Sequence, residues 1–193
     1  MAVLTCGEGG STGSEVLAQI NTNTTDIAAT ETRVTLLEGY NALVLNAESR
    51  VASQQPSGTD TALQITYGDT QSNSVVSLSS AGAVTFNEAG KYSIHVNAHY
   101  GREGASGVSI LFFRFLLNGN PLGYPLVGKI GQADTLIPWA GTLNLELEED
   151  DVLTTELLRD SDGNNSGGLF STTSSVAGWG QSSCIAMNIY KVR

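Results

Sequence analysis

The stretch SILFFRFLL, Ser109 to Leu117, has the period-two pattern of a β-strand, yet both of its faces are apolar. One face carries Leu111, Phe113, Phe115 and Leu117. The other face carries Ile110, Phe112, Arg114 and Leu116. One face fills the core of a two-sheet domain, whereas the outer face of such a domain normally contacts water. We therefore expect the second face to lie at a subunit interface, where Arg114 pairs with a carboxylate across the boundary.

The rest of the C-terminal part of the chain repeats this pattern. From about Thr61 onward, short apolar runs alternate with turn-forming residues, and they include YSIHVNAHY, TLIPWAGTLNLEL, DVLTTELL and CIAMNIYKV. Many short strands without helical spacing predict a mainly β fold, a jelly-roll sandwich that forms a head over residues 61–193.

Composition restricts the possible functions. The chain has 193 residues, of which 40% are hydrophobic and 15% charged, and this composition fits one globular domain with an appendage. The net charge is −10 and no cluster of Lys and Arg occurs, so we expect neither a nucleic-acid nor a membrane partner. No apolar run approaches the roughly 20 residues that span a bilayer, and the first residues do not resemble a secretion signal. We therefore expect a soluble protein.

A second pattern occurs nearer the N-terminus, in VLAQINTNTTDIAATETRVTLLEGY, Val16 to Tyr40. Apolar residues recur there every seven positions, and the heptad a positions are Ile20, Ile27 and Val34. The d positions are Val16, Asn23, Thr30 and Leu37. This narrow seam predicts a coiled-coil stalk over residues 16–50 whose partners are copies of the same chain. A solvated helix that packs on its own head is the alternative.

The polar d residues have a specific expected role. Asn and Thr are weak helix formers, so association must stabilise the stalk. Asn23 and Thr30 lower stability, but they disfavour slipped registers and other strand numbers.

The segments on either side of the stalk contain turn-forming residues. Residues 1–15 predict an extended arm that docks on a partner, and residues 51–60, with Pro56 and Gly58, predict a hinge. The only cysteines are Cys6 and Cys184, which cannot form a disulfide framework or a zinc site. Two free thiols are the simpler interpretation, and a Cys6 crosslink to a neighbouring subunit is the alternative.

Four segments carry a resemblance to a known superfamily: FNEAGKYSIHVNAHY, FFRFLLNGNPLG, LNLELEEDDVLTTELLRD and CIAMNIYKV. Residues 61–193 resemble the C1q and tumour-necrosis-factor-like heads, in particular the trimeric members on bacteriophage fibres and capsid decorations. QINTNTTDIAATETRV is similar to trimeric phage-fibre stalks. The resemblance implies a jelly-roll trimer on a three-stranded stalk, with its N-terminus fixed to a virion. The stalk has only a few heptads, which favours a short decoration or collar fibre.

The sequence gives little support for catalysis. His95 and His99 share a strand face, but a strand rise of about 3.3 Å per residue places them roughly 13 Å apart, too far to bind one metal. No nucleophile elbow, phosphate-binding loop or zinc-protease motif occurs. We expect no enzymatic activity, no catalytic residue and no cofactor.

Two further groups of residues are candidates for binding. Asp160, Asp162 and Asn164 alternate as at the start of many calcium loops, but the rest of an EF-hand is missing, so a polar turn is favoured and no metal is predicted. Tyr124, Trp139 and Trp179 lie in loop-like segments. These aromatic residues either bind a host glycan or protein or pack in the trimer interface.

These observations predict a non-enzymatic homotrimer of the virion surface. In this hypothesis the protein is a short fibre or decoration, anchored by residues 1–15 to a capsid, neck or tail protein. One alternative is a tail receptor-binding protein for a host-surface glycan or protein. A secreted C1q-like ligand or lectin is the alternative from another class.

Overall fold

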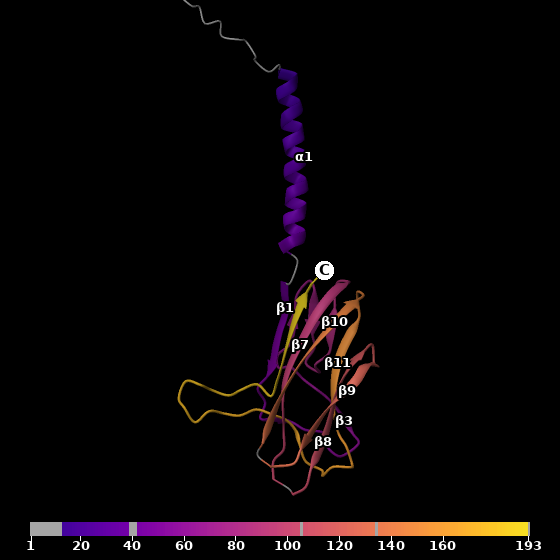
Figure 1. Cartoon of the computed structure of the whole chain (residues 1–193), viewed down its shortest axis with the longest axis vertical. Coiled ribbons are helices and arrows are strands. Elements are labelled where there is room, and N and C mark those ends of the chain that lie inside the picture. The colour runs from indigo at the N-terminus through magenta and orange to yellow at the C-terminus, as the bar shows by residue number, and fades with distance from the viewer. Residues whose placement is uncertain (1–12, 39–41, 105, 134, 193) are drawn as a thin grey trace, which may run out of the picture. The chain divides into compact units, whose positions relative to one another are not determined.

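The computed structural model describes residues 13–38, 42–104, 106–133 and 135–192. The chain divides into two compact units, Met1–Tyr40 and Asn41–Arg193. The described part of the first unit is one helix, α1 (Gly13–Glu38), and the second unit is built of strands (Figure 1). In the described residues, no helix is both long and apolar enough to cross a membrane.

Several polar side chains of α1 form hydrogen bonds within the helix. The side-chain hydroxyls of four threonines, Thr22, Thr24, Thr25 and Thr30, donate to the carbonyl oxygen four residues earlier at 2.8–3.1 Å. The side-chain amide of Gln19 donates to Asn23 Oδ1 at 2.9 Å. Every side chain from residue 13 to 31 is exposed, the apolar ones included. The described part of this unit therefore has no core of its own.

The second unit contains two antiparallel sheets. The first sheet has the order β1-β13-β7-β12-β2, and β10 also pairs with β7. Its strands are β1 (Ala42–Ser49), β2 (Ser53–Gln54), β7 (Gly90–Gly101), β10 (Leu136–Leu147), β12 (Gly168–Phe170) and β13 (Ile185–Lys191). The second sheet has the order β4-β5-β6-β11-β8-β9, and β3 also pairs with β11. Its strands are β3 (Ala62–Gln64), β4 (Gln71–Ser72), β5 (Val76–Leu78), β6 (Val84–Phe86), β8 (Ser109–Leu117), β9 (Asn120–Ile130) and β11 (Val152–Arg159).

The strand order is that of a jelly roll. A jelly roll has eight strands, which in chain order are here β1, β6, β7, β8, β9, β10, β11 and β13. In the first sheet the neighbours follow the order β1-β13-β7-β10, which is first, eighth, third and sixth along the chain. In the second sheet they follow the order β6-β11-β8-β9, which is second, seventh, fourth and fifth. The prediction of a mainly β fold is confirmed.

One hydrophobic core lies between the two sheets. Both β7 and β8 alternate buried and less buried residues along their length, so each strand turns one face inward. Ile94, Leu111 and Phe113 are completely buried, and Phe86 packs edge-on against Tyr92 with ring centroids 4.7 Å apart. Burial of such side chains stabilises the fold by about 1.5–3 kcal/mol each.

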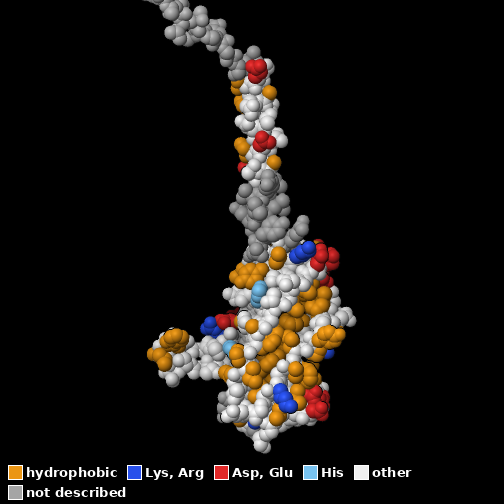
Figure 2. All heavy atoms as spheres, in the orientation of Figure 1, with side chains coloured by type: hydrophobic (Ala, Val, Ile, Leu, Met, Phe, Trp, Pro, Cys, Tyr) orange, Lys and Arg blue, Asp and Glu red, His pale blue; other side chains and the backbone are white. Residues whose placement is uncertain are grey.

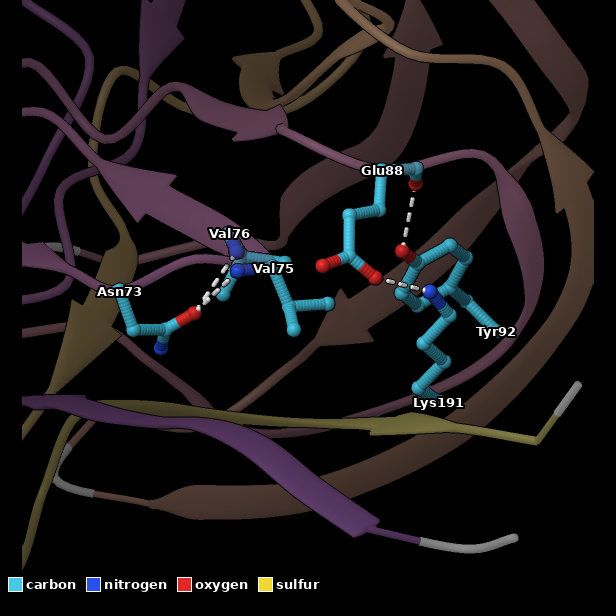
Figure 3. Close-up of polar contacts among 6 residues, drawn as sticks. All are labelled: Asn73, Val75, Val76, Glu88, Tyr92 and Lys191. Atoms are coloured by element: carbon cyan, nitrogen blue, oxygen red, sulfur yellow. Dashed lines mark hydrogen bonds and ion pairs between the residues drawn. The ribbon is translucent and has the colours of Figure 1, made fainter. Parts of the chain in front are cut away.

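The turn before β7 is fixed by Tyr92, the tyrosine of the Gly-Lys-Tyr sequence at positions 90–92 (Figure 3). The Tyr92 hydroxyl donates to the backbone carbonyl of Glu88 at 2.6 Å. The Glu88 carboxylate accepts from Lys191 Nζ on β13 at 2.5 Å. Burial raises the pKa of Tyr92 despite the nearby Lys191 charge.

Figure 3 also shows Asn73 Oδ1 accepting from the backbone N–H groups of Val75 and Val76, which sets the entry to β5.

The head begins earlier in the chain than predicted. Residues 42–49 form β1, which pairs with β13 from Ala42↔Lys191 to Ser49↔Ile185 and buries Leu45 and Ala47. The predicted stalk over 16–50 is therefore wrong beyond residue 41. The stretch ALVLNAES alternates its burial as a strand does, so it belongs to the sandwich.

Residues 51–60 are also part of the head rather than a hinge before it. Strand β2 pairs with β12, and the Pro56 carbonyl accepts a hydrogen bond from the buried Arg159 guanidinium. At the other end, residues 13–15 belong to α1 rather than to the arm. The rest of the predicted arm, including Cys6, and the side chains of Val34 and Leu37 lie outside the described residues.

Candidate functional site

One side of the sandwich is incompletely closed. Strand β9 pairs with β8 within the second sheet, and β10 pairs with β7 within the first sheet, so each is an edge strand. Their inward-facing side chains pack against the core but stay only half-buried: Leu122, Leu126, Ile137, Trp139, Leu143 and Leu145. A band of apolar side chains crosses the sandwich in the region of β10 (Figure 2). We call these six residues the open side.

Trp139 belongs to the open side. The prediction that it lies in a loop-like segment is wrong. It lies in β10, and its ring centroid is 5.4 Å from that of Phe113 in the core. A Cβ at Gly141 would lie 2.5 Å from the Trp139 ring, so the indole lies directly over that glycine. Trp139 thus extends the core toward the edge.

A bulge interrupts β9. Phe113 pairs with Leu126 and Phe115 with Leu122, so the three residues 123–125 lie opposite Arg114 alone. Gly123 has a φ of 69°, a value that favours glycine, and Tyr124 is 94% exposed. The bulge therefore turns Tyr124 into solvent in the single chain, and its role in surface binding or in a trimer interface stays a prediction.

The second face of β8 is stabilised from within the chain. Arg114 Nε and Nη2 donate to Glu156 Oε2 at 2.9 and 2.7 Å, because β11 pairs with β8 in the register Glu156↔Arg114. Within the single chain the carboxylate comes from the neighbouring strand, and a pairing of Arg114 across a subunit boundary stays a prediction. Ile110 and Phe112 are half-buried and Leu116 is buried in the single chain.

A pocket of about 270 Å³ lies on this face. Its apolar lining comes from Ala62, Phe112, Pro125 and Leu158. Its charged lining comes from Arg114, Glu156 and Asp160. Strands β3, β8, β9 and β11 and the residue after β11 contribute these side chains, and the bulge supplies Pro125. We call this the second-sheet pocket.

An ordered ribbon, residues 171–183, connects β12 to β13 and projects from the sandwich (Figure 1). Backbone bonds Ser182 N to Thr172 O at 2.8 Å and Ser174 N to Gly180 O at 2.9 Å hold its two arms together. Trp179 near its tip is 80% exposed. The structure thus places Trp179 in a projecting loop, as predicted, and far from the core.

The two histidines lie on the outer face of the first sheet. His95 Nε2 and Nδ1 lie 3.1 and 3.0 Å from the hydroxyls of Ser93 and Thr142, and the Tyr190 ring packs edge-on against the imidazole. His99 Nδ1 lies 3.0 Å from the Ser183 carbonyl oxygen. Each histidine therefore has local hydrogen-bond partners of its own.

The segment with Asp160, Asp162 and Asn164 forms a hydrogen-bonded turn. Asp160 Oδ1 accepts from the Asp162 N–H at 2.7 Å, and Asn164 Oδ1 accepts from Ser109 Oγ at 2.9 Å. Within the described ranges, no group of three or more His, Cys, Asp or Glu side chains is placed to hold a metal ion. These bonds tie the turn to the start of β8.

Cys184 is buried, free and 3.6 Å from the side-chain amide of Gln54. No sequence signal identified the pocket or the β9 bulge. The pocket depends on which strands become neighbours, and this pairing cannot be read from one strand alone.

Proteins similar to this chain are found among the solved structures. No family model matches it, and no curated protein matches it either. Among solved structures, the chain is similar to the globular domain of zebrafish complement 1qA protein, at 16% sequence identity and a TM-score of 0.43. The match covers 77% of this chain and 95% of that domain. The jelly-roll arrangement itself rests on the strand order described above.

Proposed function

We propose that this chain is a non-enzymatic, homotrimeric structural protein of a bacteriophage virion, a short fibre or decoration displayed at the virion surface. The observation that carries the proposal is α1, a 26-residue helix whose described apolar side chains are all exposed. Phage origin and the number of three come from the resemblance of the stalk and head sequences.

The need for a partner follows from the energetics of α1. Its composition, rich in Thr and Asn, makes the isolated helix marginal in water. Ile20 and Ile27 are 54% and 58% exposed, and burial of each is worth about 1.5–3 kcal/mol. Both occupy a positions, so a parallel bundle of copies buries them together.

The open side supports association of the heads. Its half-buried residues lie on the two edge strands, β9 and β10. A neighbouring head that covers this side removes apolar surface from water and protects both edges. We propose this side as the head-to-head contact, while the β8 face with Ile110, Phe112, Arg114 and Leu116 carries the pocket.

Attachment is proposed to reside in the segment before α1. Three copies of a short arm on one trimer gain avidity for a symmetric site on a capsid, neck or tail protein. A Cys6 crosslink between subunits remains a prediction for this segment.

Sedimentation of the whole chain at micromolar concentration tests the trimer. The expected mass is about three times the 20.2 kDa of one chain. Ile20→Asp together with Ile27→Asp should dissociate the stalk, because each places a charge in the apolar seam.

Thr25→Asp is the matched control, because Thr25 lies at heptad position f, on the opposite side of the helix. It should leave the mass unchanged. A wild-type chain that sediments as a compact monomer contradicts the proposal.

A second candidate function is a tail protein that binds a host-surface glycan or protein. Exposed aromatic residues on shaped elements favour it, namely Tyr124 on the β9 bulge and Trp179 on the ribbon. Copy number per particle separates the two functions, because a shell component is present many times and a tail protein a few times.

A further inference from the structure

We propose that the second-sheet pocket binds one neutral sugar ring. This inference rests on the second candidate function, the binding of a host-surface glycan, and it names the site and the ligand class. The pocket volume of about 270 Å³ lies just below the usual range for drug-sized ligands and suits a single ring.

The charged floor of the pocket favours a neutral ligand. Arg114 uses Nε and Nη2 for Glu156, and both bonds end on Glu156 Oε2. Arg114 Nη1 and Glu156 Oε1 carry no hydrogen bond to any other described residue, and so leave one donor and one acceptor of the ion pair for a ligand. An ionic ligand would have to compete with the existing ion pair. Asp160 adds a negative charge that disfavours anions.

The apolar walls match the other half of a sugar. Pyranose rings carry C–H groups on one face and hydroxyls at the edge, and the hydroxyls both donate and accept. Phe112, Pro125 and Leu158 offer apolar surface to the C–H face. An apolar protein side chain fits less well, because it would leave Arg114 Nη1 and Glu156 Oε1 covered and unpaired.

The bulge in β9 shapes the rim of this pocket. Three residues opposite Arg114 break the ladder at this point, and one of them, Pro125, lines the pocket. Bulges concentrate near binding sites, where they redirect side chains. Arg114 has a side-chain exposure of 43% and Glu156 of 23%, so a ligand can reach the pair.

The test titrates the whole chain with glucose, galactose, mannose, N-acetylglucosamine and N-acetylgalactosamine. N-acetylneuraminic acid serves as the anionic control. Saturation-transfer NMR and calorimetry should detect at least one neutral sugar with a Kd in the millimolar range, and no binding of the acidic sugar. Absence of neutral-sugar binding at millimolar concentration, or tighter binding of the acidic sugar, overturns the proposal.

Substitutions locate the site. Phe112→Ala and Glu156→Gln should each lower the affinity for the detected sugar by at least about tenfold, equivalent to about 1.4 kcal/mol. Arg114→Lys keeps the charge but removes the planar fork, so it should also weaken binding while the fold is retained. Trp179→Ala is the matched control on the ribbon and should leave affinity unchanged.

If Trp179→Ala abolishes sugar binding and the pocket variants keep it, the sugar binds at the ribbon and the proposal is overturned. Loss of the trimer in Phe112→Ala, without any sugar binding by the wild type, makes this face a protein interface and overturns it as well. Sedimentation reports the trimer independently, so failure of the sugar site leaves the proposed assembly standing.

Discussion

At the scale of single residues, Tyr67 and Tyr100 show how differently two buried hydroxyls contribute to stability. Tyr67 shares a hydrogen bond of 2.9 Å with Thr155 across the core. The Tyr100 hydroxyl is buried without a hydrogen-bond partner among the described residues. A buried hydroxyl stabilises only when it is paired.

Substitution by phenylalanine separates the two cases. Tyr67→Phe should lower the free energy of unfolding by about 1–2 kcal/mol, because it leaves the Thr155 hydroxyl unpaired. Tyr100→Phe should leave the free energy of unfolding unchanged or raise it, because no hydrogen bond is lost. Urea denaturation with an unchanged m-value measures both. A larger loss in Tyr100→Phe than in Tyr67→Phe would contradict this assignment.

The same residues predict how stability depends on pH. Burial raises the pKa of Tyr67 and Tyr100 above the ordinary value of 10.0. Below about pH 10 both states keep these protons, and above it the unfolded chain releases protons that the folded chain retains. Stability should therefore fall as pH rises above about 10, by up to about 1.4 kcal/mol per pH unit for each tyrosine.

Denaturation at several alkaline pH values checks the slope. Tyr100→Phe should make the slope of unfolding free energy against pH shallower by the contribution of one proton. An identical slope in wild type and Tyr100→Phe would show that Tyr100 is not shielded from solvent.

At the scale of elements, the two polar d residues of α1 have different roles in the proposed coiled coil. The Thr30 hydroxyl is bonded to the Asp26 carbonyl within the helix, so its methyl group is free to face the seam. Asn23 accepts from Gln19 with Oδ1, and its amide N–H groups remain for a partner. We therefore assign register specificity mainly to Asn23.

Asn23→Ile tests this assignment. It should raise the melting temperature of the assembly and relax its subunit number, because an apolar d position tolerates several packings. Thr30→Ile should raise the melting temperature with less effect on subunit number. Circular dichroism melts and sedimentation measure the two effects, and a lower melting temperature for Asn23→Ile would place Asn23 away from the axis.

The elements also show what the sequence could and could not predict. Alternation in the segments of β8 and β7 is strong enough to identify both as strands. Strand β1 is not evident from the sequence because its register shifts between Leu43 and Leu45, which disturbs the alternation. Pro138 and Gly141 give the segment around Trp139 a loop-like composition, although an edge strand such as β10 accommodates proline.

The site was predictable only in part. The exposure of Tyr124 and Trp179 followed from local turn-forming residues. The pairing of Arg114 with Glu156 depended on β11 lying beside β8, and sequence periodicity does not determine which strands become neighbours.

At the scale of the whole molecule, the proposed function assigns assembly and display to different parts of the chain. The segment before α1 is proposed to attach, α1 to associate and the sandwich to present its surfaces. Deletion of residues 1–12, which stops short of α1, should abolish particle attachment and leave the trimer intact. Co-sedimentation with particles and sedimentation of the free protein measure the two effects, and truncated protein that still decorates particles would refute this division.

The prolines and the bulge of β9 and β10, the edge strands of the open side, have a further consequence for association between heads. Pro121 and Pro125 in β9 and Pro138 in β10 lack the N–H group that a docking strand needs, and the bulge disrupts a straight template. Separated heads should therefore not add strands to one another along the open side, because neither β9 nor β10 offers an unbroken edge for strand pairing.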